Sequence, residues 1–122
     1  MMTESGLANQ ISAGFVSIAS ENTFSLFAFF SAGLVNFFVP SGGCQWAVQA
    51  PIIIPAADSM GLDLAKPIIA VAWGDAWTNL AQPFWALPIL AIAGLKARDI
   101  MGYCLISLVV SGAIISAWLL LL

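Results

Sequence analysis

A single acidic residue, Asp75, lies in the apolar stretch 68–95. A carboxylate near the centre of a bilayer costs about 2.5–3.5 kcal/mol on insertion scales, so it is rare there without a partner or a function. Because removal from water favours the protonated form of a carboxyl group, Asp75 indicates proton coupling or cation binding. The alternative is that it is hydrogen-bonded to neighbouring groups and only holds helices together. Three polar residues follow at helical spacings of three, four and seven, on the same face as Asp75: Thr78, Asn79 and Gln82.

A second candidate site is the sequence Pro-Ser-Gly-Gly at 40–43, in the middle of a charge-free run. Proline lacks an N–H donor and the glycines permit positive φ, so a helix should stop here. The N–H groups that open the next half-helix can then bind an anion; the alternative is a simple turn. Gln45 and Gln49 share a helical face that either lines the cavity or bridges helices by hydrogen bonding. The candidate ligands for a substrate anion are therefore Ser41, Gly42, Gly43 and Gln45.

The residue inventory argues against an enzyme. The chain has no histidine and two cysteines, which lie in separate apolar runs. Catalysis by Ser-His-Asp or Cys-His is excluded, and nothing supports a metal site, a cofactor or a redox CxxC pair. Three basic residues are too few for a nucleic-acid partner. They lie in predicted loops, so an anion inside the membrane must be held by backbone N–H and hydroxyl groups: Lys66, Lys96 and Arg98.

The composition places the chain in a membrane. Of its 122 residues, 61% are hydrophobic and 7% are charged, whereas soluble domains are about 25% charged and roughly half apolar. A folded chain of this size still exposes about a third of its unfolded surface, so it cannot hide so many apolar side chains from water. We therefore expect an all-α integral membrane protein that has lipid as a partner.

The first half of this single membrane-embedded region (1–122) contains two predicted segments. Residues 1–21 place apolar side chains at a period near 3.6 and predict an amphipathic helix at the membrane interface. The charge-free part of residues 22–58 would measure roughly 54 Å as one helix, against about 30 Å of hydrocarbon. With its break at 40–43, that segment predicts either a broken, re-entrant helical hairpin or two short spans.

The second half predicts a discontinuous helix, a polar loop and a plain transmembrane helix. Pro83 and Pro88 interrupt residues 68–95, and each frees the carbonyl group four residues earlier for water, an ion or a substrate. Residues 96–99 form a tight loop, which its positive charges place in the cytoplasm, with the preceding charged loop outside. Residues 100–122 carry no charge and are long enough to span the bilayer.

Three strings of the sequence are specific rather than generic: NFFVPSGGCQWAVQ at 36–49, VAWGDAWTNLAQPFWALP at 71–88 and AIAGLKARDIMGYC at 91–104. They resemble the bacterial short-chain fatty acid transporter family, and the resemblance covers essentially the whole chain. It implies a multi-pass protein of the cell inner membrane that takes up small carboxylates such as acetoacetate or butyrate by proton symport. The residues that the resemblance marks are Ser41, Gly42, Gly43, Gln45, Asp75, Thr78 and Asn79.

Members of that family are several times longer, so the chain resembles only their C-terminal portion. Cys44 stands where the family's loop usually carries a third glycine. Substrate sites in such transporters lie between two repeats. The expected partners are therefore a missing N-terminal half or a second copy of this chain, besides lipid and the carboxylate substrate. Two alternatives are an inactive truncated fragment or interaction protein, and a small exporter that assembles with itself.

Overall fold

The computed structural model describes residue 6, residues 10, 13, 14 and 17, and residues 23–121. Within these residues the structure consists of helices and turns and contains no strand, which agrees with the all-α prediction. The amphipathic helix predicted over 1–21 lies mostly outside the described residues. Those of its positions that are described and helical are Gln10, Ala13, Gly14 and Ser17.

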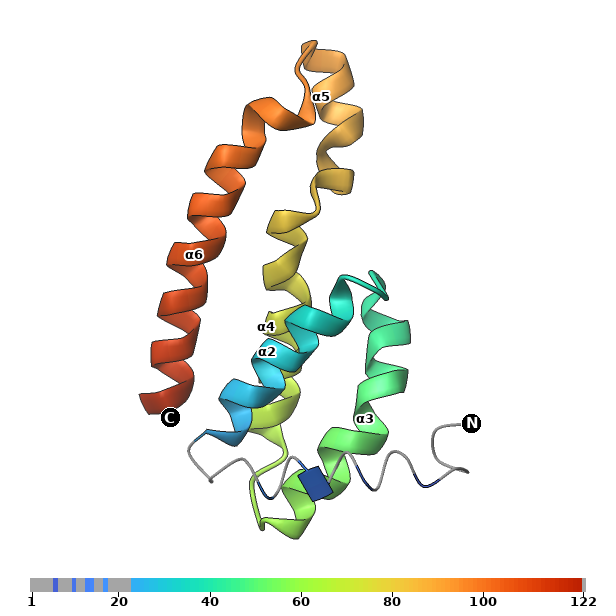
Figure 1. The fold of residues 1–122 in the computed structure, drawn as a ribbon, viewed down its shortest axis with the longest axis vertical. Helices are drawn as coiled ribbons and strands as arrows, with labels where there is room; N and C mark the ends of the chain where they lie inside the picture. The colour runs from blue at the N-terminus through green and yellow to red at the C-terminus, as the bar shows by residue number, and fades with distance from the viewer. Residues whose placement is uncertain (1–5, 7–9, 11–12, 15–16, 18–22, 122) are drawn as a thin grey trace.

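The charge-free segment forms two helices, α2 (Phe24–Asn36) and α3 (Gly42–Ser59). Figure 1 shows them as a hairpin, in which α2 runs toward the turn and α3 returns to the same end of the molecule. Ser41 ends the turn with extended backbone (φ −149°, ψ 111°) and precedes the first residue of α3. The hairpin therefore presents the N-terminus of α3 at its turn.

The predicted discontinuous helix consists of α4 (Ala65–Thr78), two short 3₁₀ helices at 79–81 and 83–86, and α5 (Leu87–Ala93). The expectation that its prolines leave two carbonyl groups free is wrong. The Asn79 carbonyl accepts hydrogen bonds from the Gln82 N–H and the Trp85 indole, both at 3.1 Å. The second carbonyl belongs to Phe84, four residues before Pro88. It accepts a hydrogen bond from the backbone N–H of Leu87. The chain itself thus supplies the donors that the prolines lack.

The last helix, α6 (Ala97–Leu121), is the one helix of the described chain that is long and apolar enough to cross a membrane. It begins three residues before its predicted start, so the predicted loop at 96–99 is too long. Gly94, at φ 69°, ends α5, and the Asp99 carboxylate accepts the Lys96 N–H at 2.8 Å, which fixes the first turn of α6. The α3–α4 and α5–α6 connections lie at opposite ends of the molecule (Figure 1).

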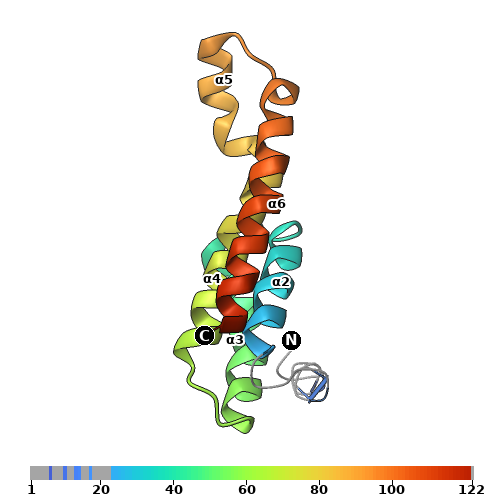
Figure 2. The ribbon, with the colours of Figure 1, turned by 90° about the vertical axis from the view of Figure 1, so that its left-hand side faces the viewer.

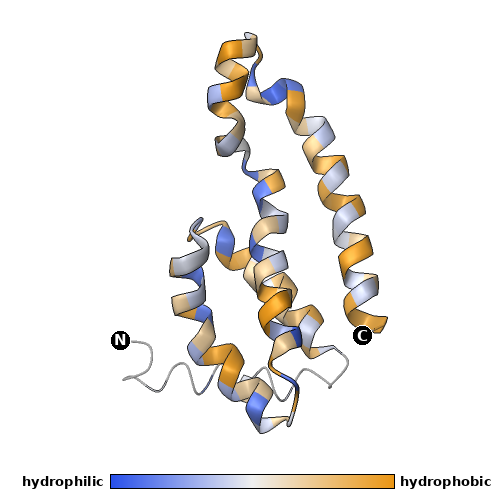
Figure 3. Ribbon diagram, turned by 180° about the vertical axis from the view of Figure 1, so that it is seen from behind, coloured by the Kyte–Doolittle hydropathy of each residue, from blue (hydrophilic) through white to orange (hydrophobic). Residues whose placement is uncertain are grey.

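Small residues let α2 and α4 pack with their backbones close together. A Cβ atom at Gly74 would collide with the Phe29 carbonyl oxygen and lie 2.8 Å from the Ala32 Cβ. Ala28 and Ala70 are fully buried in the same core. Figure 2 shows α6 in front of α2 and α4, and Figure 3 shows hydrophilic residues at the α5–α6 connection and around the hairpin turn.

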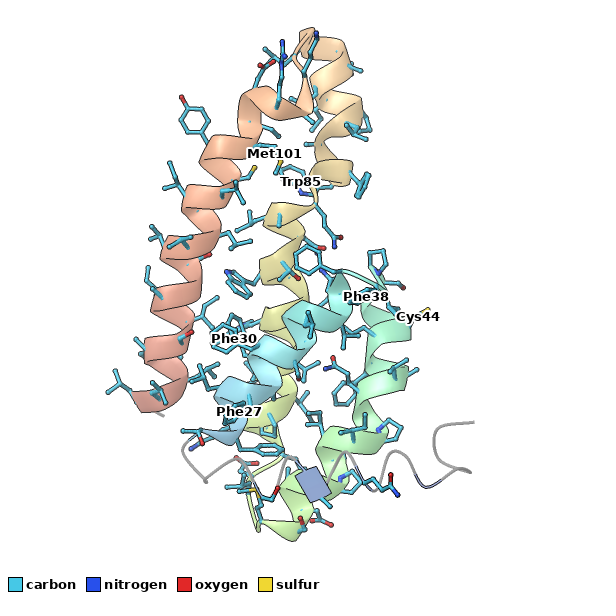
Figure 4. The ribbon with its side chains drawn as sticks, in the orientation of Figure 1. Phe27, Phe30, Phe38, Cys44, Trp85 and Met101 are labelled. Atoms are coloured by element: carbon cyan, nitrogen blue, oxygen red, sulfur yellow. The ribbon has the colours of Figure 1, made fainter. Side chains whose placement is uncertain are left out.

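Trp77 connects α4 to α2 and to α6. Its indole N–H donates to the Leu108 carbonyl at 2.7 Å, and its ring fills the notch at Gly112, where a Cβ atom would lie 2.6 Å from the ring. The same ring packs against Phe29 and Phe30, with centroid distances of 4.9 and 5.8 Å. Figure 4 shows Phe30 on the side of α2 that faces α6. The core thereby holds α4 in one position relative to α2 and α6.

Gly74→Val should destabilise this core. The added side chain collides with α2 backbone, and overpacking of this kind costs about 1–3 kcal/mol. We expect a lower melting temperature for the detergent-solubilised protein, followed by tryptophan fluorescence. Gly102→Val in α6 is the matched control, because a Cβ atom there meets nothing within 4 Å. Equal melting temperatures for the two variants would contradict the close α2–α4 contact.

Candidate functional site

A cavity of about 400 Å³ lies between the start of α3 and the middle of α4. Its polar groups are the side chains of Gln45 and Asp75 and the backbone of Gly42 at the start of α3. Small-molecule sites commonly measure about 300–1,000 Å³ and combine apolar walls with a few polar groups. Three of the seven residues predicted for the site therefore meet in one cavity of suitable size. The remaining lining is apolar and consists of Trp46, Ile68, Val71 and Ala72.

The N-terminus of α3 is open at the polar end of this cavity. The Gln45 N–H donates to the Ser41 carbonyl at 2.8 Å as the first bond of the helix, so the N–H groups of residues 42–44 have no acceptor within α3. The Ser41 side chain does not cap them. Ser41 and Gly43 flank Gly42, are exposed, and do not line the cavity. The open N–H groups at the positive end of the helix can bind an anion.

Asp75 places its carboxylate beside the first residue of α3. A Cβ atom built on Gly42 would lie 3.1 Å from Asp75 Oδ2, and both residues line the same cavity. Asp75 is half-buried. No described residue donates a hydrogen bond to its carboxylate, and no basic residue of the described chain lines the cavity. The carboxyl group is thus available to a ligand or a proton rather than held in an ion pair.

The two glutamines of α3 bridge to α2, which is one of the two alternatives that their spacing predicts. Gln45 is 1% exposed, and its Nε2 donates to the Ala32 carbonyl at 2.9 Å and to Gln49 Oε1 at 3.0 Å. Gln49 Nε2 in turn donates to the Ser31 hydroxyl at 3.3 Å. Gln45 Oε1 is buried and has no hydrogen-bond partner among the described residues. One buried acceptor of a residue that lines the cavity therefore lacks a donor among the described residues.

Asn36, which the sequence reasoning missed as a site residue, joins the polar face of α4 to α2. Its Nδ2 lies 2.9 Å from each of three oxygens: the Asp75 carbonyl, Thr78 Oγ1 and Asn79 Oδ1. Gln82 Nε2 donates to the Asn36 carbonyl at 3.4 Å. A backbone carbonyl can only accept, so the amide nitrogen must face Asp75. All four residues of the predicted polar face thus contact Asn36.

The structure separates Thr78 and Asn79 from the cavity of Asp75. Thr78 is 3% exposed and donates to the Gly74 carbonyl at 3.3 Å, so it supports the α2–α4 contact. Asn79 lines a second cavity of about 430 Å³ with Pro40 and Gln82. One signal for Asn36 was present in the sequence, because it is the one amide or charged side chain between residues 24 and 44.

Asn36→Leu should destabilise the junction between α2 and α4. The change leaves the Thr78 and Asn79 side chains without their buried donor, and each unsatisfied buried group costs about 1–3 kcal/mol. We expect a lower melting temperature in detergent. Gln82→Leu removes one long hydrogen bond from a half-buried residue and serves as the milder control. A larger effect of the control would contradict the central position of Asn36.

Comparison with known proteins identifies the family. The family model described as short chain fatty acid transporter matches residues 1–122. A relative from Escherichia coli (strain K12) is 54% identical over 114 residues, which are 93% of this chain and 26% of the relative. A relative from Haemophilus influenzae (strain Rd) is 50% identical over 114 residues, which are again 93% of this chain and 26% of the relative.

Both relatives carry the name short-chain fatty acid transporter as a provisional assignment. The chain spans about a quarter of the length of these curated relatives. No solved structure matches it. Because the family model matches this chain over its full length, the chain belongs to the short-chain fatty acid transporter family.

Proposed function

We propose that this chain forms the carboxylate-binding part of a multi-pass transporter that takes up acetoacetate or butyrate with a proton across the bacterial inner membrane. The observation that carries the proposal is the division of the cavity between α3 and α4 into a polar end and an apolar wall. A short-chain fatty acid has the same division between its carboxylate and its alkyl chain. The names of the two relatives point to the same substrate class.

The substrate carboxylate binds the open N–H groups at the start of α3, beside Gly42, Gly43 and the Ser41 hydroxyl. No lysine or arginine of the described chain lines this cavity, so backbone groups supply the positive potential. The alkyl chain lies against the apolar wall, whose members include Val71 and Ala72. Burial of each methylene group on that wall contributes about 0.8 kcal/mol.

Two of the remaining predicted site residues, Thr78 and Asn79, act at the other end of the polar face, outside the first cavity. Asn79 contacts the substrate in the second cavity, which it lines together with Gln82. Thr78 is too buried for direct contact and acts through its hydrogen bond with Asn36. Gln45 lines the first cavity, and its hydrogen bond to the Ala32 carbonyl holds this part of α3 against α2. Asp75 carries the proton, because it is the acidic group that lines this cavity.

A second wall completes the cavity. Three of its lining residues, Gly42, Ile68 and Ala72, are exposed in the described chain. Because transporter sites form between repeats, the covering wall is the N-terminal portion of a longer transporter or a second copy of this chain. The apolar and largely exposed α6 faces lipid. Without such a partner the chain would be inactive, which is the truncated-fragment alternative of the sequence analysis.

The test is uptake of labelled butyrate by proteoliposomes. One sample contains the E. coli relative with its matched segment replaced by this chain, and a second contains this chain alone. Protein-free vesicles are needed as a control, because the undissociated acid crosses lipid unaided. We expect the chimera to accumulate butyrate when the outside is made acidic. The proposal would be overturned if the chimera inserted into the membrane but accumulated no more butyrate than protein-free vesicles. Uptake by the sample with this chain alone shows whether a second copy can replace the N-terminal portion.

A further inference from the structure

We infer that the substrate carboxylate and the Asp75 carboxylate bind side by side at the start of α3 as a pair that shares one proton. Each substrate anion is then bound together with one proton. The inference rests on the proposed function and deepens it, because it names the contact through which proton and substrate are coupled.

The first observation is the position of Asp75 relative to the anion-binding N–H groups. Asp75 Oδ2 lies 3.1 Å from the Cβ position of Gly42, and the open N–H groups belong to residues 42–44. A substrate anion on these groups therefore contacts the Asp75 carboxylate. Two carboxylates in contact cannot both stay ionised, since their repulsion in a site of low dielectric constant is strong. Binding of the anion thus requires one proton on the pair.

The second observation is that Gln45, the amide side chain that lines the cavity, has no free donor. Both hydrogens of its Nε2 are used, one by the Ala32 carbonyl and one by Gln49 Oε1. Gln45 therefore cannot donate a hydrogen bond to a second carboxylate in the cavity. The repulsion between the substrate carboxylate and Asp75 is then relieved by a proton and not by this amide.

Other titratable groups do not line this cavity in the described chain. The helix α2 carries none, and α3 carries Cys44, which points away from α4 (Figure 4), and Asp58 in its last turn. On α4 itself, Lys66 lies in the first turn. The titratable groups of α6 lie within 98–104, in the half that adjoins α5. Asp75 is thus the group of the described chain whose protonation state affects substrate binding in this cavity.

The test measures protons taken up on binding. Calorimetric titration of butyrate into the chimera in lipid nanodiscs, in buffers of different ionisation enthalpy, gives the number of protons per butyrate. At a pH where Asp75 is ionised in the free protein, we expect one for the unmodified protein and one for Asp58→Asn, whose exposed carboxylate lies outside the cavity. We expect none for Asp75→Asn. The affinity of the unmodified protein should fall about tenfold per pH unit wherever Asp75 is ionised in the free protein.

Butyramide provides a second test that needs no variant. It has the same alkyl chain but no charge, so its binding to the unmodified protein should take up no proton and should not weaken as the pH rises. Butyrate binding that takes up no proton at any pH, or proton uptake retained by Asp75→Asn, would overturn the shared proton and leave the proposed function standing. Absence of butyrate binding at every pH would instead overturn the proposed function.

Discussion

Asp75→Asn should abolish the accumulation of butyrate driven by a pH gradient while preserving the exchange of labelled for unlabelled butyrate. The amide has the shape of a protonated carboxyl group but cannot release or bind a proton at neutral pH. It removes the carboxylate that lies beside Gly42, so the anion can still occupy the start of α3. Accumulation in proteoliposomes of the chimera should fall to the level of protein-free vesicles.

Two comparisons decide whether Asp75 carries the proton or only holds helices together. Asp58→Asn removes an exposed carboxylate from the end of α3 and should accumulate butyrate as the unmodified protein does. Loss of both accumulation and exchange in Asp75→Asn, with a lowered melting temperature, would support the purely structural alternative. Retained accumulation would show that the proton is carried elsewhere.

Local sequence signals were sufficient for the order of the helices. Pro40 with its glycines, and Pro83 with its neighbours, mark the positions where backbone donors are missing or φ is unrestricted, and helices end near both. The length and apolar character of α6 needed no tertiary information. The same signals mislead inside α3, which continues through Pro51 and Pro55 because their effect depends on the packing around the helix.

The site could be predicted less completely, because its contacts join distant parts of the chain. Helical periodicity placed Asp75 and Asn79 on one face but did not reveal that Asn36 occupies that face from α2. It could not show that the Trp85 indole and the Gln82 N–H satisfy the carbonyl freed by proline. The contact of Gly42 with Asp75 is likewise a tertiary contact, because the two residues lie 33 positions apart in the sequence.

Gly42→Leu should weaken butyrate binding at least tenfold, or by about 1.4 kcal/mol. Its Cβ atom would lie 3.1 Å from Asp75 Oδ2, and the rest of the side chain must occupy the polar end of the cavity. Leucine is a better helix former than glycine by nearly 1 kcal/mol, so loss of binding cannot be ascribed to a weaker α3. The affinity is measured by the same calorimetric titration in nanodiscs.

Gly102→Leu in α6 is the control for this variant. A Cβ atom there meets nothing within 4 Å, and the residue is exposed and does not line the cavity. The variant adds the same side chain to the protein without reaching the start of α3. We therefore expect an affinity close to that of the unmodified protein. If Gly102→Leu weakened binding as much as Gly42→Leu, the loss would not arise at the polar end of the cavity, and the cavity shared with Asp75 would not be the binding site.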